Sequence, residues 1–123
     1  MDSYIVRCRQ DIALDILQHP TVVRPLGLYA DSVLDDFEWW LVDDKLLVAL
    51  KPQGKEVEVH IACKFRDRHS VRESMKNGLE YLKFRKFKTV WTTAPNNRKA
   101  LLNMLTALNF TRAGEGRWEL KLL

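Results

Sequence analysis

The chain has 123 residues, of which 46% are hydrophobic and 29% charged, and it contains 5 glycines and 4 prolines. This is the composition of an ordinary globular protein, long enough for one hydrophobic core, so we expect a single domain over residues 1–123. No apolar run approaches the roughly 20 residues of a membrane span, and the N-terminus lacks the basic-then-apolar pattern of a signal peptide, so we expect a cytoplasmic protein without a membrane segment.

Charge is distributed unevenly along the chain. The formal net charge is +4, but residues 1–63 carry a net charge of −5 and residues 64–123 carry +9. The basic half favours a phosphate-bearing ligand, either a cofactor or a nucleic acid. The basic residues between 83 and 88 also fit an ordinary solvated helix face, whereas Arg66 and Arg68 lie beside a predicted helix start and are better placed to bind an anion.

The first half of the chain alternates between strand and turn patterns. In chain order we predict a strand at residues 4–8, a helix at 11–18, turns with one short helix over 20–36, and strands at 37–42, 45–50 and 56–65. Short polar turns at 43–44 and 52–55 connect the last three strands, which we expect to be antiparallel. Trp39 and Trp40 must point to opposite faces of their strand, so one of them is expected in the core.

Residues 56–88 carry the clearest pattern. The strand alternates strictly, with Glu56, Glu58 and His60 on one face and Val57, Val59, Ile61, Cys63 and Phe65 on the other. The following helix has an apolar face formed by Val71, Met75, Leu79 and Leu82. Ser70 and Glu73 have the spacing of a capping box, which predicts that the helix begins after Ser70. A helix N-terminus beside several arginines favours an anion such as phosphate.

The second half continues with a strand at residues 89–93 and a helix that Asn96 or Asn97 caps and Asn109 ends. Two strands then flank a turn at residues 114–116, with Trp118, Leu120 and Leu122 alternating inward. The complete order predicts a mixed, mostly antiparallel sheet flanked by helices, of the α+β or α/β class.

This order of elements resembles that of the GCN5-related N-acetyltransferases (GNATs), over nearly the whole chain. The family's R-x-x-G-x-G/A loop, which holds the pyrophosphate of acetyl-CoA, matches the run from Arg66 to Val71, and a second family signature matches Asn97, Ala100 and Asn109-Phe110. The resemblance implies acetyl-CoA as cofactor, with the binding residues Ile61, Cys63, Arg66, Arg68, His69, Ser70, Val71, Arg72 and Asn97. In size the chain is similar to compact members of this type from tailed bacteriophages.

Acetyl transfer to an amine needs a base that removes a proton from the ammonium group. Glu58 and His60 share the polar face of their strand and are the candidate catalytic residues. His60 is the favoured base, because histidine exchanges a proton near neutral pH. The same pattern also fits a structural histidine bonded to a neighbouring strand. The histidines and cysteines have no metal-ligand spacing, so we expect no metal site.

Two functions stay open from the sequence. The first is an acyl-CoA-binding protein that transfers an acetyl group to a small-molecule or protein amine. The second is a catalytically degenerate protein of the same fold that binds a protein partner, such as a bacteriophage accessory or virion component. His69 and Val71 stand where the family has glycine or alanine, and Met104 or Leu105 where it has a proton-donating tyrosine. We do not expect nucleic-acid binding, because the sequence reveals no exposed aromatic platform.

Overall fold

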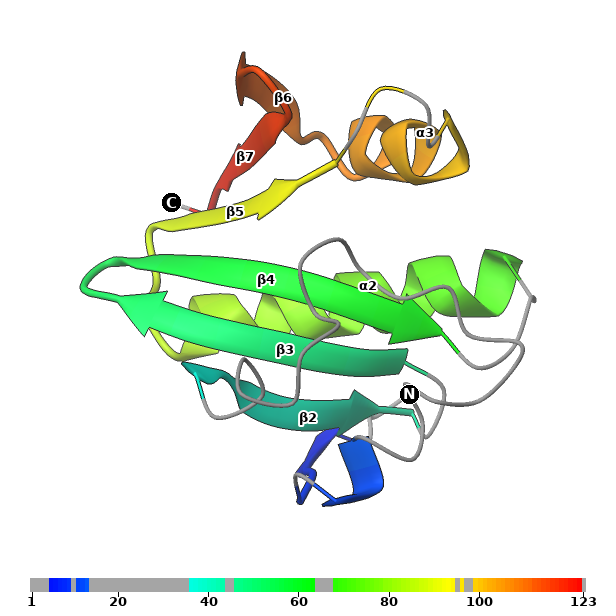
Figure 1. Ribbon diagram of the computed structural model, residues 1–123, viewed down its shortest axis with the longest axis vertical. Helices are drawn as coiled ribbons and strands as arrows, with labels where there is room; N and C mark the ends of the chain where they lie inside the picture. The colour runs from blue at the N-terminus through cyan, green and yellow to red at the C-terminus, as the bar shows by residue number, and fades with distance from the viewer. Residues whose placement is uncertain are drawn as a thin grey trace.

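The computed structural model describes residues 5–9, 11–13, 36–43, 46–63, 68–94, 96 and 99–122. Its main element is a seven-stranded sheet with the order β1-β2-β3-β4-β5-β7-β6 (Figure 1). The strands are β1 (Ile5–Arg7), β2 (Glu38–Val42), β3 (Leu46–Gln53), β4 (Glu56–Cys63), β5 (Thr89–Thr93), β6 (Thr111–Gly114) and β7 (Arg117–Lys121), and the labelled helices are α2 (Arg68–Phe84) and α3 (Lys99–Ala107). Neighbouring strands are antiparallel except β4 and β5, which are parallel.

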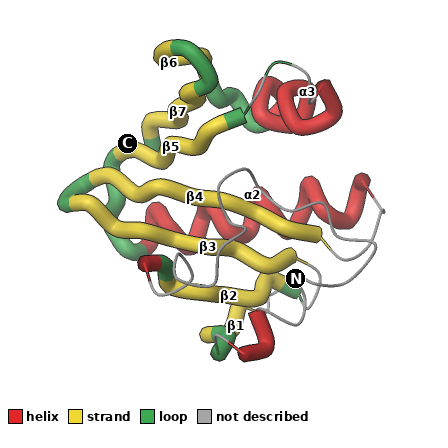
Figure 2. The backbone as a smooth tube through the Cα atoms, in the orientation of Figure 1, coloured by secondary structure: helices red, strands yellow, loops and turns green. Residues whose placement is uncertain are grey.

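The predicted fold class is confirmed, since the sheet is mixed, mostly antiparallel and flanked by helices. α2 crosses behind β3 and β4 in Figure 1, and Figure 2 shows the same arrangement with the helices in red. The strand predicted at 89–93 has the predicted bounds. Of the helix predicted at 11–18, residues 11–13 are described and are helical, and most of the region predicted as turns over 20–36 lies outside the described residues.

One hydrophobic cluster joins the sheet to both helices. Its buried members are Val42, Leu46, Val48, Leu50, Val57, Leu82, Phe87, Val90, Ala94, Leu105, Leu108, Phe110 and Leu122. Met75 and Leu79 of α2 pack against this cluster, so the apolar face predicted for the helix is the face that it buries. Trp118 and Leu120 pack against it from β7, together with the buried Leu122, which confirms the alternation predicted for the last strand.

β3 is an interior strand of the sheet and is buried on both faces from Leu46 to Leu50. Leu46, Val48 and Leu50 face α2, while Leu47 and Ala49 on the opposite face are each 1% exposed. Burial on both faces explains why this strand is a continuous apolar run instead of an alternating one. Trp39 and Trp40 lie on opposite faces of β2, as predicted: Trp39 is buried beside Ala49, and Trp40 packs against the cluster on the α2 side.

α2 and α3 are each followed by a residue with left-handed backbone conformation, Lys86 (φ 69°) after α2 and Asn109 (φ 70°) after α3. After α3 the backbone N–H of Phe110 donates to the Leu105 carbonyl at 2.9 Å, and that of Asn109 donates to Thr106 at 3.0 Å. These two bonds form a Schellman motif, in which asparagine tolerates the left-handed conformation. Asn109 therefore ends the helix as predicted.

α2 begins earlier than predicted. The helix begins at Arg68, so Ser70 lies inside its first turn and the predicted capping box is wrong, because a capping residue must precede the first helical residue. The helix ends at Phe84. There the backbone N–H groups of Lys86 and Phe87 donate to Lys83 and Leu82, at 2.8 Å and 3.3 Å, and turn the chain towards β5.

Candidate active site

β4 and β5 pair over only part of their lengths. β4 is paired with β3 along all of its residues, from Glu56 to Cys63. Its register with β5 contains three pairs and ends at Glu58↔Trp91. The strands diverge beyond this point, as the green and yellow arrows of Figure 1 show. The edge of β4 from Val59 to Cys63 is therefore not paired with β5, and a strand edge of this kind can bind an extended ligand through its backbone.

Glu58 and His60 are brought together on β4. Their spacing of two residues places both on the face opposite α2, and His60 Nε2 lies 2.6 Å from Glu58 Oε2. The side chain of His60 is 7% exposed and that of Glu58 is 17% exposed. Phe37 makes an edge-to-face contact with the imidazole, with 5.6 Å between ring centroids. The polar face of β4 is thus more closed than the alternating pattern suggests.

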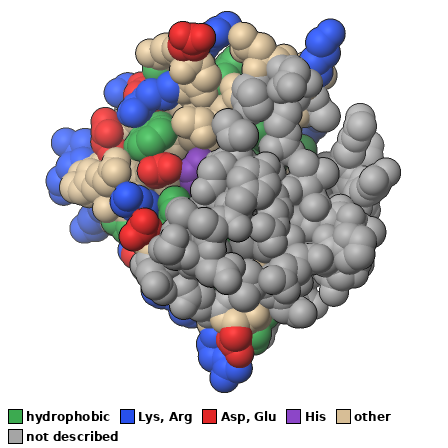
Figure 3. All heavy atoms as spheres, viewed as in Figure 1, with side chains coloured by type: hydrophobic (Ala, Val, Ile, Leu, Met, Phe, Trp, Pro, Cys, Tyr) green, Lys and Arg blue, Asp and Glu red, His purple; other side chains and the backbone are tan. Residues whose placement is uncertain are grey.

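Three further side chains share this face and were not predicted as site residues. Trp91 of β5 lies beside Glu58 in the sheet register, and Glu119 of β7 lies beside Trp91. The Arg117 guanidinium stands 4.2 Å from the centroid of the Trp91 ring and 2.8 Å from the Glu119 carboxylate. Figure 3 views this face and shows acidic and basic side chains near a small histidine surface. Only the pairing of β4, β5 and β7 brings these residues together, so no local motif marks them.

Two kinds of site have no support within the ranges that the structure describes. No group of three His, Cys, Asp or Glu side chains lies close enough to hold one metal ion. No described helix is long and apolar enough to cross a membrane.

Burial, together with the charge of Asp11, raises the pKa of the Cys8 thiol, which keeps it in the less reactive protonated form.

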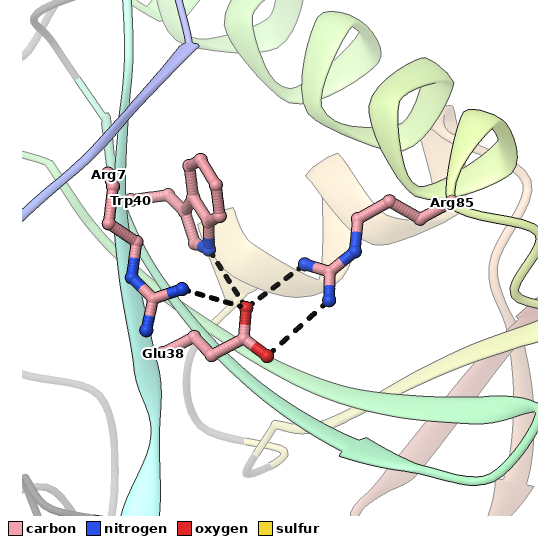
Figure 4. A network of polar contacts seen from close by, with 4 residues as sticks. All are labelled: Arg7, Glu38, Trp40 and Arg85. Atoms are coloured by element: carbon pink, nitrogen blue, oxygen red, sulfur yellow. Dashed lines mark hydrogen bonds and ion pairs between the residues drawn. The ribbon is translucent and has the colours of Figure 1, made fainter.

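A second polar network lies on the α2 side of the sheet and joins β1, β2 and the end of α2 (Figure 4). Arg85 donates two hydrogen bonds to the Glu38 carboxylate, at 3.0 Å and 3.4 Å. Arg7 and the indole N–H of Trp40 also donate to Glu38. Burial works to raise the pKa of Glu38, but the hydrogen bonds from Arg85 and Trp40 and the charges of Arg85 and Arg7 outweigh it and leave the pKa below its usual value. The ionised Glu38 thus anchors α2 to the sheet.

Replacing Glu38 by Gln should lower the free energy of unfolding by about 1–2 kcal/mol at neutral pH, because it removes a charged acceptor from two arginines. Since folding lowers the pKa of Glu38, its stabilisation is fully present above the unfolded pKa of about 4.3 and is lost as the pH falls through the folded value. In urea denaturation, the free energies of unfolding of the unchanged protein and of Glu38→Gln should therefore become equal as the pH is lowered into the acidic range.

The matched control is Glu73→Gln, which removes a carboxylate from the exposed pair of Glu73 and Lys76 at 3.8 Å. The free energy of unfolding of this variant should equal that of the unchanged protein at every pH, because an exposed ion pair contributes little to stability. A stability difference for Glu38→Gln that stays constant from neutral to acidic pH would contradict the assignment of its effect to the ionised carboxylate.

Solved structures of several acetyltransferases have the same arrangement of strands and helices. The ribosomal-protein-S18-alanine N-acetyltransferase from Escherichia coli matches with a TM-score of 0.76 at 13% identity, over 98% of this chain and 94% of that chain. The IAA acetyltransferase from Bacillus cereus matches with a TM-score of 0.73 at 10% identity, over 98% and 99%. The spermidine/spermine N-acetyltransferase SpeG from Vibrio cholerae, in mutant form, matches with 0.72 at 11% identity, over 98% and 95%. The fold is that of the GCN5-related N-acetyltransferases. No protein-family model and no curated protein matches the sequence.

The described residues among those expected to hold acetyl-CoA lie at the end of β4 and the start of α2 in this GNAT fold. Ile61 and Cys63 belong to the part of β4 that is not paired with β5, and Arg68, His69, Ser70, Val71 and Arg72 belong to the start of α2. Arg66 and Asn97 lie outside the described residues. His69 and Val71 are in the α-helix, a conformation that does not need glycine. A strand edge followed by a helix N-terminus fits a ligand with an extended arm and a pyrophosphate.

Proposed function

We propose that this protein binds acetyl-CoA along the end of β4 and the start of α2 and transfers its acetyl group to an amine. The observation that carries the proposal is the early end of the β4–β5 register, which leaves the edge from Val59 to Cys63 without a partner in β5. α2 begins five residues after Cys63, so one ligand can reach both the strand edge and the helix N-terminus. The fold that the chain shares with solved acetyltransferases supports this class of reaction.

Glu58 and His60 supply the proton chemistry in this proposal, while acetyl-CoA supplies an acetyl group activated as a thioester. Glu58 accepts a hydrogen bond from the N–H at His60 Nε2 across 2.6 Å, which leaves Nδ1 to accept a proton from the ammonium group of the acceptor. The Glu58 carboxylate then stabilises the imidazolium that forms, as a carboxylate does beside a catalytic histidine. Once the carbon–sulfur bond of the thioester has broken, the imidazolium gives up this proton, which balances the negative charge of the departing thiolate. Phe37 fixes the plane of the ring.

Calorimetric titration with acetyl-CoA tests binding directly. Saturable binding is expected, and Arg68→Ala should weaken it by about 10- to 100-fold, because a charged hydrogen bond to phosphate contributes about 1.5–3 kcal/mol. Arg66→Ala should have a similar effect. Arg112→Ala, which removes an exposed arginine from β6, is the control and should bind normally. Absence of binding at millimolar acetyl-CoA would refute the acetyltransferase proposal. Normal binding by both arginine variants would mean that the pyrophosphate does not bind at the start of α2.

The alternative function is a catalytically degenerate GNAT-fold protein that serves as a binding or assembly component, such as an accessory or virion protein of a bacteriophage. One observation favours it. Leu105 is buried in the hydrophobic cluster and Met104 packs against it, so neither position of α3 that matches the family's tyrosine offers a proton donor. Mass analysis of purified particles distinguishes the two functions: presence of the chain in particles, with no acetyl transfer to a panel of amines, would support assembly over catalysis.

A further inference from the structure

The turn that follows α2 presents an aromatic ring to solvent. Phe84 is 81% exposed, whereas Phe87, three residues later, is 7% exposed and lies in the hydrophobic cluster. Arg85 between them is held by Glu38. The left-handed Lys86 and the two hydrogen bonds that end α2 fix this turn. Phe84 is therefore held outward by a defined backbone, and its ring covers no part of the core.

Lysines lie close to this ring. Lys83 and Lys86 flank it on the helix end and turn, and two more lysines lie at the adjacent end of the sheet. There the Lys88 backbone N–H donates to the Lys55 carbonyl at 2.8 Å. We call Phe84 with Lys55, Lys83, Lys86 and Lys88 the Phe84 patch. Figure 3 shows Lys and Arg side chains gathered at the left edge, the end of the molecule where the β3–β4 turn lies in Figure 1.

Few carboxylates of the protein neutralise the lysines of the Phe84 patch. Lys83 lies 3.9 Å from Glu80, in a pair whose side chains are 48% and 75% exposed. Lys55, Lys86 and Lys88 form no ion pair within 4.0 Å in the described structure, and all three are exposed. A cluster of unpaired lysines raises the local concentration of anions and is favourable only to a partner that carries several negative charges.

The Phe84 patch is separate from the proposed active site. Phe84 is the last residue of α2, and the predicted pyrophosphate residues are at its first turn. A helix of 17 residues is about 25 Å long at 1.5 Å per residue. One acetyl-CoA molecule bound at the start of the helix therefore does not account for the aromatic ring and the lysines at its end.

We propose that the Phe84 patch binds single-stranded nucleic acid, with a base stacked on the Phe84 ring and phosphates paired with the surrounding lysines. An exposed aromatic ring within a basic surface is the combination that binds unpaired bases without sequence preference. Duplex nucleic acid buries its bases, so the ring would find no stacking partner there. An anionic membrane is the poorer fit, because interfacial binding relies on a broad apolar face and this patch has one apolar side chain. Phe84 supplies an exposed aromatic ring that the sequence alone does not reveal.

Fluorescence anisotropy with a labelled single-stranded oligothymidylate of about 20 nucleotides tests the proposal, since it exceeds the roughly 4–16 nucleotides of a typical site. Phe84→Ala and Phe84→Leu should each weaken binding about 10-fold, because leucine retains an apolar surface but cannot stack on a base. Lys86→Glu combined with Lys88→Glu should abolish it. With about four phosphate contacts, a fourfold rise in salt should weaken binding about 50-fold.

The matched control is Lys76→Glu combined with Lys99→Glu, which makes the same charge change on exposed lysines outside the patch and should reduce binding much less. Far-ultraviolet circular dichroism confirms that each variant is folded. Equal binding of a duplex of the same length, or unchanged binding by Phe84→Leu, would overturn the stacking proposal. Binding to anionic phospholipid vesicles without binding to the oligonucleotide would overturn it in favour of a membrane surface.

Discussion

Replacing His60 by Asn is expected to lower the rate of acetyl transfer by about 10²- to 10⁴-fold, the usual contribution of a positioned general base. Affinity for acetyl-CoA should be retained, because His60 points to the face opposite α2 and its bonded partner is Glu58. The measurement is a steady-state assay of thiol release with a panel of amines, together with calorimetric titration of the same preparation. The loss should appear in kcat and kcat/KM alike.

Glu58→Gln separates the proton role of His60 from a structural role. Glutamine retains a hydrogen-bond acceptor for the imidazole but carries no charge to stabilise the imidazolium, so we expect a smaller loss of rate, about 10-fold, and an altered pH–rate profile. If His60 were only structural, His60→Asn would lower the free energy of unfolding and leave the rate per folded molecule unchanged. That outcome would place the base elsewhere on the face that carries Trp91 and Glu119.

Replacing Leu50 by Ala is expected to lower the free energy of unfolding by about 3 kcal/mol, within the range of 2–5 kcal/mol for buried Leu→Ala substitutions. Leu50 is 2% exposed and lies in the middle of the sheet, in the cluster shared with Val57 and Leu82. Neighbours on two strands and a helix cannot all move into the space that its side chain leaves, so a cavity persists. Urea denaturation at fixed pH measures the change.

Phe84→Ala is the control for Leu50→Ala. It deletes a larger apolar side chain, but one that is 81% exposed, so the free energy of unfolding should change by less than about 0.5 kcal/mol. A comparable loss in both variants would mean that Phe84 is buried in solution by another part of the protein. It would also remove the basis for a nucleic-acid surface at the end of α2.

The elements that sequence reasoning predicted well are those specified by nearby residues. The strand at 89–93, the apolar face of α2 and the helix end at Asn109 each depend on side-chain periodicity or on one residue's backbone preference. The fold class followed from their order. The predicted start of α2 was wrong, because the capping-box spacing of Ser70 and Glu73 expresses a local preference that does not exclude an earlier start of the helix.

The features that escaped prediction depend on contacts between distant residues. His60 is buried because Phe37 and the neighbouring strands enclose it, and nothing within β4 signals this. Phe84 and Phe87 are the same residue type three positions apart, yet one is exposed and the other is core, because the left-handed Lys86 redirects the chain between them. Of the predicted site, the Glu58–His60 pair is brought together at 2.6 Å, and its catalytic role stays a prediction.

The short register between β4 and β5 also has a mechanical consequence. β1 to β4 form one hydrogen-bonded ladder, β5, β7 and β6 form another, and three residue pairs connect them. The two ladders are also joined by the ion pair of Arg117 and Glu56 at 3.8 Å, beside the paired residues, and by the hydrophobic cluster, with Leu50 and Val57 on one side and Val90 and Leu122 on the other. Apolar packing is non-directional, unlike a hydrogen bond. The two ladders can therefore rotate relative to each other about the paired residues Glu56–Glu58. Such a rotation widens the gap between the diverging ends of β4 and β5 as apolar side chains slide past one another, and it breaks no hydrogen bond within either ladder.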